Sequence, residues 1–146
     1  MKALIQRVKH ADVVVNHQSV GAIDQGLLAF IGIEKQDEQA KADKLLNKIL
    51  GYRIFADEQG KMNKSLADIN GGLLLVSQFT LAADTKKGMR PSFSSAAAPD
   101  LAEQLYDYTV AQAKALHQGS VQTGSFAADM QITLLNDGPV TFMLEA

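Results

Sequence analysis

Only two stretches of this 146-residue chain have the apolar periodicity of a long amphipathic helix, and this small number limits the folds open to the chain. The first stretch has its apolar stripe at Ala42, Leu45, Leu46, Ile49 and Leu50. Asp37 is placed to cap this helix, and Gly51 is placed to end it. The second stretch begins with Pro99 and Asp100, which suit a first helical turn. Its stripe consists of Ala102, Leu105, Tyr106, Thr109, Ala113 and Leu116.

The other apolar segments predict strands. Residues 3–15 and 19–23 predict a hairpin around a turn, residues 27–33 a strand buried on both faces, and residues 73–81 the most apolar strand of the chain. The last part, residues 120–146, is again typical of strands with turns. Two helices are too few to cover both faces of a parallel sheet. We therefore predict an α+β fold with a mostly antiparallel sheet system.

The composition is that of a folded domain. A length of 146 residues suits one domain spanning 1–146, and 47% hydrophobic with 21% charged residues excludes a disordered or fibrous chain. The absence of cysteine excludes disulfides, thiolate zinc sites and cysteine nucleophiles. A formal net charge of −2 argues against sequence-independent coating of nucleic acid, but it leaves room for one local basic patch.

Neither a targeting segment nor a metal motif is recognisable. Gln6, Arg7, Lys9 and His10 interrupt the apolar residues near the start, so no signal peptide is predicted. The apolar run at 27–33 is too short to span a bilayer. The three histidines, His10, His17 and His117, have no zinc-motif spacing, and we interpret them as surface or structural residues. We expect a cytoplasmic protein without metal, cofactor or membrane attachment.

Two hydroxyl groups stand where the most apolar strand ends. On a continued strand, Ser77 and Phe79 would face one side, and Gln78 and Thr80 the other. A hydroxyl nucleophile needs a base, yet no motif ties a histidine or lysine to either hydroxyl, and the G-x-S-x-G motif is absent. These residues alone favour ordinary strand-end hydroxyls over nucleophiles.

A long loop follows at residues 82–98. Loops of this length in compact domains are usually functional or disordered. Its charges, Lys86, Lys87 and Arg90, are most simply solvated, but they could instead contact RNA phosphates.

Near the end of the chain, four turn-forming residues interrupt an apolar run. Asn136, Asp137, Gly138 and Pro139 favour a hairpin turn between two strands. The bond between glycine and proline can be cis or trans, and these residues do not decide between the two.

Taken together, SQFTLAADTKKGMRPSFS at 77–94 and NDGPVTF at 136–142 resemble the two signature motifs of the D-aminoacyl-tRNA deacylases. Four further blocks are similar to that family: ALIQRV at 3–8, LGYRIF at 50–55, GKMN at 60–63 and QTGSFAADM at 122–130. The resemblance therefore covers essentially the whole chain. One departure is Ser125, at a place that commonly holds arginine in bacterial members, so we assign no nucleic-acid contact to it.

The resemblance implies an enzyme that hydrolyses the ester between a D-amino acid and the 3′-terminal adenosine of tRNA. It also implies removal of glycine mischarged onto alanine tRNA, while L-aminoacyl-tRNA is spared. The expected architecture is a homodimer with a β-barrel-like core and an active site at the subunit interface.

The resemblance also implies where the chemistry takes place. Its catalytic group comprises Ser77, Gln78, Phe79 and Thr80. The side chains do little acid–base work in this family, because the 2′-OH of the terminal ribose assists hydrolysis and backbone N–H groups, including that of Phe79, form an oxyanion hole. The alternatives are an acyl-enzyme formed on Thr80 or Ser77, and a tRNA-binding dimer without turnover.

Substrate selection is assigned by the same resemblance to three other residues. Gly138 and Pro139, joined by a cis bond, would enter the partner's pocket, bind the α-amino group through their carbonyls and block an L side chain. Met130 joins them in binding the substrate. A built-in clash separates mirror images better than attraction does, because both enantiomers carry the same groups. Lys86, Lys87 and Arg90 are the candidate contacts to tRNA.

Overall fold

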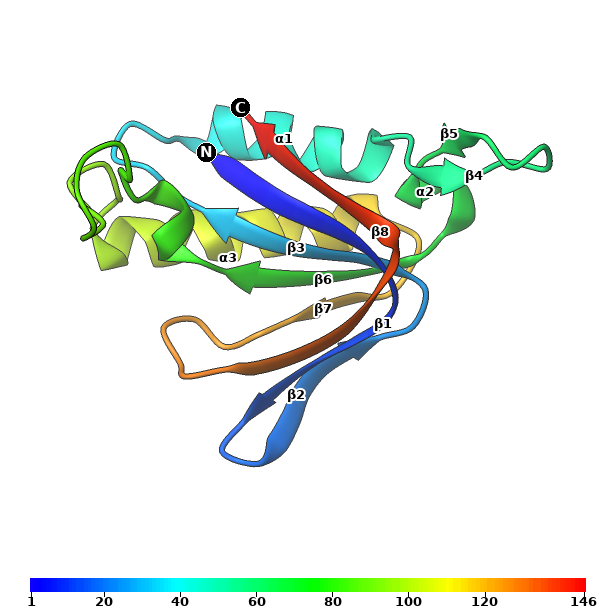
Figure 1. The fold of residues 1–146 in the computed structure, drawn as a ribbon, viewed down its shortest axis with the longest axis horizontal. Helices are drawn as coiled ribbons and strands as arrows, with labels where there is room; N and C mark the ends of the chain where they lie inside the picture. The colour runs from blue at the N-terminus through cyan, green and yellow to red at the C-terminus, as the bar shows by residue number, and fades with distance from the viewer.

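A sheet of six strands, with two long helices packed against one face, forms most of the molecule (Figure 1). The computed structural model describes residues 1–146 without a gap. The strands of this sheet are β1 (Lys2–Val15), β2 (Gln18–Ile23), β3 (Gly26–Gly32), β6 (Gly72–Ser77), β7 (Val121–Thr123) and β8 (Gln131–Glu145). The long helices are α1 (Gln39–Gly51) and α3 (Pro99–Leu116). The short elements are β4 (Phe55–Ala56), β5 (Met62–Lys64), α2 (Leu66–Ile69) and the 3-10 helix η1 (Phe79–Ala82).

Strand β1 organises the sheet. Along one edge it pairs antiparallel with β8, and along the other it pairs antiparallel first with β3 and then with β2. Strand β6 runs parallel to both β3 and β7. The predicted α+β class, with two main helices and a mostly antiparallel sheet, is confirmed.

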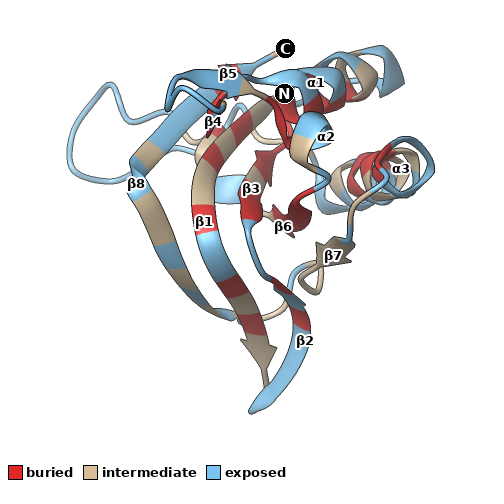
Figure 2. Cartoon of the chain, turned by 90° about the vertical axis from the view of Figure 1, so that its right-hand side faces the viewer, coloured by how far each residue is buried: buried red, intermediate tan, exposed pale blue.

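The sheet curls until it almost closes on itself (Figure 2). Strands β2 and β7 come together at Gly21, where a Cβ atom would collide with the carbonyl oxygen of Thr123. The missing side chain lets the two backbones approach. The expected barrel-like core is therefore present as a nearly closed sheet.

Two apolar cores lie on opposite faces of the strands. The larger one fills the space between the sheet and helices α1 and α3, and the smaller one lies inside the curled sheet. In β3, Leu27 and Ala29 belong to the larger core, and Leu28 belongs to the smaller one. This alternation follows from the two-residue period of a strand. The prediction that residues 27–33 are buried on both faces is confirmed.

The helices form where the sequence predicts, but two details were wrong. The N-cap of α1 is Glu38, without a side-chain bond. The buried carboxylate of Asp37 instead accepts hydrogen bonds from the Met1 ammonium at 2.8 Å and the Glu34 N–H at 2.7 Å. In α3, Leu116 is exposed, because the last turn extends beyond the core. No helix is long and apolar enough to cross a bilayer.

The predicted hairpin turn at residues 136–139 is also wrong, because β8 runs through these residues without reversing. Its register against β1 shifts on both sides of Val8, which faces Asn136. The Asn136 side chain bridges the extra residues by accepting a hydrogen bond from the Val140 N–H at 2.7 Å. A bulge of this kind tolerates Pro139, which has no N–H to give to a ladder.

Candidate active site

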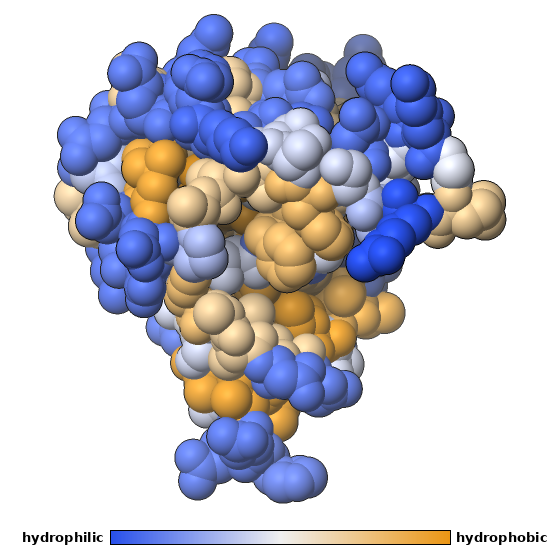
Figure 3. All heavy atoms as spheres, turned by 90° about the vertical axis from the view of Figure 1, so that its left-hand side faces the viewer, coloured by the Kyte–Doolittle hydropathy of each residue, from blue (hydrophilic) through white to orange (hydrophobic).

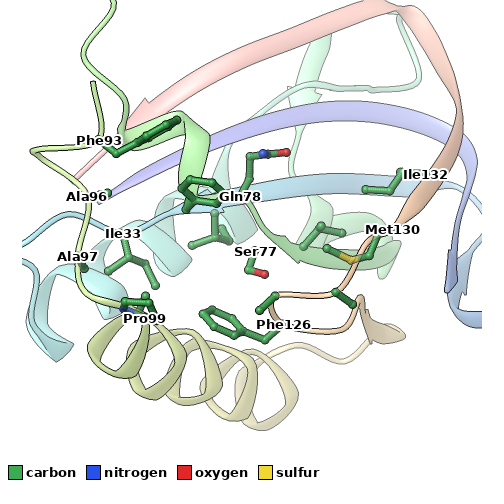
Figure 4. A pocket seen from close by; sticks show the side chains of 16 residues that line it. Ile33, Ser77, Gln78, Phe93, Ala96, Ala97, Pro99, Phe126, Met130 and Ile132 are labelled. Carbon is green, nitrogen blue, oxygen red and sulfur yellow. The ribbon is translucent and has the colours of Figure 1, made fainter. Parts of the chain in front are cut away.

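A cavity of about 590 Å³ opens where strand β6 ends. Figure 4 shows Phe93, Ala96 and Pro99 on one side of it and Met130 and Ile132 on the other. Its full lining is Ile31, Ile33, Val76, Ser77, Gln78, Phe79, Phe93, Ala96, Ala97, Pro99, Ala102, Phe126, Ala127, Ala128, Met130 and Ile132. Ser77 and Gln78 contribute the only polar side chains, and no lining residue titrates near neutral pH. The cavity therefore has no side-chain acid, base or cation of its own.

The polar groups of the cavity come from a sharp change in backbone direction. Strand β6 stops at Ser77, and the Gln78 N–H donates to the Ile31 carbonyl at 2.8 Å. The chain then enters η1, whose first bond runs from the Leu81 N–H to the Gln78 carbonyl at 3.2 Å. The N–H groups of Phe79 and Thr80 precede this bond and have no acceptor within the turn. The expected alternation of residues 77–80 between two faces is wrong, because only Ser77 still belongs to a strand.

Thr80 is placed differently from its neighbours. Its side chain is exposed and does not line the cavity. The Gln78 amide donates a hydrogen bond to the Thr80 hydroxyl. Ser77, Gln78 and Phe79 therefore lie together at the cavity, whereas the Thr80 hydroxyl lies outside it.

Aromatic rings form part of the cavity wall and its rim. Phe79 is 61% exposed, and its ring lies 5.1 Å from that of Phe93. Phe126 packs against Tyr106 at 5.9 Å between centroids. Figure 3 views the side of the molecule that carries η1 and the start of α3, and apolar side chains occupy the centre of that face. Exposed rings beside an apolar cavity suit a flat aromatic ligand.

Tyr106 supports the cavity from behind. Its buried hydroxyl donates to the Leu75 carbonyl at 2.8 Å. Burial, and to a lesser extent the charge of Asp107, raises the pKa of this hydroxyl well above its ordinary value of 10.0. The neutral side chain thus ties α3 to the strand that ends at Ser77.

The loop between β7 and β8 forms the remaining wall. Ala127 has a φ of +61°, which side-chain-bearing residues rarely adopt, and the Ala128 N–H donates to the Ser125 carbonyl at 3.2 Å. Met130 follows this turn and lines the cavity, as its predicted contact with substrate requires.

Gly138 and Pro139 do not line the cavity of their own chain. The peptide bond between them is cis, and Gly138 has a φ of +147°. Arg7, a residue that the sequence did not single out as functional, binds the backbone of Asp137, the residue before Gly138. Its Nε donates to the Asp137 carbonyl at 2.9 Å, and its Nη1 donates to the Ile54 carbonyl at 2.7 Å. The only signal for Arg7 in the sequence was its place in the ALIQRV block.

The basic residues Lys86, Lys87 and Arg90 are exposed and lie outside the cavity. Two backbone hydrogen bonds between Asp84 and Ser92, of 2.7 and 3.0 Å, close the base of their loop. The three cations therefore belong to one closed loop that follows η1. No cluster of histidine and carboxylate side chains in the molecule could hold a metal ion.

This geometry agrees with the comparison with known proteins. A family model described as D-Tyr-tRNA(Tyr) deacylase matches residues 4–145. The chain belongs to this family. It is 65% identical to the D-aminoacyl-tRNA deacylase of Stutzerimonas stutzeri (strain A1501) over 146 residues, which is 100% of both chains. It is 66% identical to that of Pseudoalteromonas translucida (strain TAC 125) over 99% of both chains. A deacylase is a hydrolase, so the predicted enzyme class is confirmed.

Two solved structures share the fold. A protein named c-Myc DNA Unwinding Element Binding Protein matches with a TM-score of 0.96 and 38% identity, over 100% of this chain and 99% of that one. A probable eukaryotic D-amino acid tRNA deacylase matches with a TM-score of 0.81 over 99% and 98%, at only 17% identity. The second likeness shows that the fold persists where most residues differ.

Proposed function

We propose that this protein hydrolyses the ester of D-aminoacyl-tRNA to free amino acid and tRNA, and that it spares L-aminoacyl-tRNA. Glycine mischarged onto alanine tRNA is a second substrate. The observation that carries the proposal is a cavity with no titratable side chain, beside a turn whose first two N–H groups, those of Phe79 and Thr80, have no acceptor, in a chain that belongs to a deacylase family. Such a site suits a substrate that brings its own reactive hydroxyl. The proposed setting is the cytoplasm.

In the proposed reaction, water attacks the carbonyl carbon of the aminoacyl ester. The N–H groups of Phe79 and Thr80 stabilise the oxyanion that forms, since they precede the first hydrogen bond of η1. The bond to the ribose 3′-oxygen then breaks, and that oxygen receives a proton. The 2′-OH of the same ribose assists this proton movement, because the cavity has no base. The adenine packs on the apolar wall near Phe93.

Chiral selection is proposed to come from a second copy of the chain. Gly138 and Pro139 lie outside the cavity of their own chain, as this proposal requires. Their carbonyls would bind the α-amino group and occupy the direction in which an L side chain would project. Arg7 would hold this segment through the Asp137 carbonyl. Met130 would contact the bound aminoacyl group from within the cavity.

Solvent-exposed apolar residues on β8 support the proposal of a homodimer. Leu135, Phe142 and Met143 are exposed on this strand, and the ring of Phe142 packs against that of Tyr52 at 5.6 Å. Large apolar side chains exposed along one strand suit a protein interface. The expected result is a sedimentation mass twice that of one chain, and a monomer at micromolar concentration would contradict it.

The closed basic loop is proposed to contact tRNA. Lys86, Lys87 and Arg90 project from it on a chain whose net charge is −2, so the positive charge is local. Cations of this kind position a nucleic acid through its phosphates.

Two other functions remain to be separated from this one by experiment. An acyl-enzyme on Thr80 or Ser77 would need a base, and the Thr80 hydroxyl has only the Gln78 amide as a hydrogen-bond partner. A nucleic-acid-binding dimer without turnover would bind charged tRNA but release no amino acid. The name of the 38% identical protein, which mentions binding to a DNA element, is a reason to measure binding as well as turnover.

The test is release of D-tyrosine from D-tyrosyl-tRNA by the purified protein. A second substrate ends in 2′-deoxyadenosine, so that the hydroxyl proposed to assist is missing. We expect fast release from the first substrate and a large loss of rate on the second. An acyl-enzyme would retain activity on the second, and a binding module would leave both intact.

A further inference from the structure

At Gly124, the side chain of Met130 leaves no space for a Cβ atom. A Cβ atom at Gly124 would lie 2.6 Å from the Met130 sulfur. It would lie 3.7 Å from a methyl carbon of Val13 and 3.7 Å from one of Val76, which are ordinary contacts. The thioether therefore occupies the space of a side chain at position 124.

The backbone at Gly124 has little freedom to retreat. Its N–H donates to the Leu75 carbonyl at 3.1 Å, and the same carbonyl accepts the Tyr106 hydroxyl. A larger residue would thus push the Met130 sulfur away by about 1 Å to reach a normal contact distance.

The direction of that movement follows from what surrounds Met130. On one side it packs against the smaller core, which is closely packed. On the other side it lines the cavity beside Ser77 (Figure 4). The cavity is the open side, so a displaced Met130 enters it.

We propose that Gly124 is a positioning residue, which seats the Met130 thioether against the backbone and so keeps the cavity wide enough for the reacting aminoacyl group. The proposal rests on the proposed function, because it gives the space beside Met130 to the substrate. Methionine is flexible, so Gly124→Ala shifts the side chain without preventing folding.

The kinetic test is a double-mutant cycle on D-tyrosyl-tRNA with Gly124→Ala, Met130→Ala and both together. Gly124→Ala is expected to lower kcat/KM by roughly 10- to 200-fold, the effect of one excess methylene group in an apolar site. In the Met130→Ala background it is expected to have no further effect, since no thioether remains to be displaced. Gly51→Ala is the matched control, because a Cβ atom there meets nothing within 4 Å, and wild-type activity is expected.

A readout without substrate separates this inference from the proposed function. The chain has five methionines, so methyl-labelled protein gives five resonances, and Met130→Ala identifies that of Met130. In Gly124→Ala the Met130 resonance is expected to shift, and that of the fully exposed Met89, which does not line the cavity, to stay. An unmoved Met130 resonance, or an equal kinetic loss in both backgrounds, overturns the inference. If wild-type protein releases no D-tyrosine, the proposed function fails, while the resonance still tests the seating of Met130.

Discussion

Removal of Arg7 should loosen the segment that contains Gly138 and Pro139 and lower the stability of the fold. The guanidinium makes two hydrogen bonds to carbonyl oxygens, of 2.9 Å to Asp137 and 2.7 Å to Ile54. Its Nε also lies 3.7 Å from the Asp137 carboxylate. Arg7→Ala removes all of these interactions, whereas Arg7→Lys keeps the charge but cannot reach both carbonyls with a planar fork.

The size of the effect follows from the environment of the side chain. A hydrogen bond to a charged group contributes about 1.5–3 kcal/mol when well buried. The Arg7 side chain is 16% exposed and that of Asp137 is 36% exposed. In Arg7→Ala, water can therefore hydrogen-bond to part of what Arg7 bonded, and the loss of stability is smaller than for a fully buried pair. We expect Arg7→Ala to lower the free energy of unfolding by about 2–3 kcal/mol, which is a fall in Tm of roughly 5–10 °C for a domain of this size.

The assay is thermal unfolding followed by circular dichroism, with deacylation of D- and L-tyrosyl-tRNA measured on the same samples at 25 °C. Lys9→Ala is the matched control, because Lys9 is an exposed cation on the same strand. We expect Arg7→Ala to reduce the preference for the D substrate, since the backbone proposed to exclude L side chains is no longer held. If Arg7→Ala melts like Lys9→Ala and keeps full selectivity, then Arg7 does not support this segment.

Three further predictions concern separate parts of the molecule. Thr80→Ala should keep activity within about tenfold of wild type, the cost of one hydrogen bond, whereas loss of a nucleophile costs roughly 10⁴-fold or more in single-turnover kinetics. Burial raises the pKa of the Tyr106 hydroxyl above 10.0, so the stability that the neutral hydroxyl contributes is fully present below pH 10.0 and is lost as the pH rises through the folded-state pKa. Chemical denaturation between pH 8 and 11 should therefore show that the free energy of unfolding falls more steeply in wild type than in Tyr106→Phe. Equal slopes would refute this. Replacing Lys86, Lys87 and Arg90 together by alanine should reduce the slope of log Kd against log salt for tRNA by roughly 2–3, about one for each phosphate that the variant no longer neutralises, and an unchanged slope would mean that the loop is only solvated.

The elements of the fold that local patterns determine were predictable. The stripe around Leu45 and Ile49 predicted α1, and the apolar run at 27–33 predicted a strand buried on both faces. The errors arose where distant groups decide the outcome. Asp37 has the chemistry of a helix cap, but the Met1 ammonium and the Glu34 N–H engage its carboxylate instead.

The same limit applied to the candidate site. Asn136, Asp137, Gly138 and Pro139 are all turn formers, yet the strand continues through them as a bulge, because β1 pairs with β8 on both sides of it, and no local pattern reports that pairing. The strand predicted over residues 73–81 ends at Ser77, four residues early, because the chain turns there into the 3-10 helix η1, which no local pattern indicated. The close approach of Gly124 to Met130 was equally hidden, because it depends on how the β7–β8 loop folds back.

The central claim is that this protein removes D-amino acids, and not L-amino acids, from tRNA. It is tested most directly by the wild-type protein on one tRNA charged in parallel with D-tyrosine and with L-tyrosine. We predict rapid release of D-tyrosine while L-tyrosyl-tRNA decays at its uncatalysed rate. Release of both at similar rates, or of neither at micromolar protein, would contradict the account.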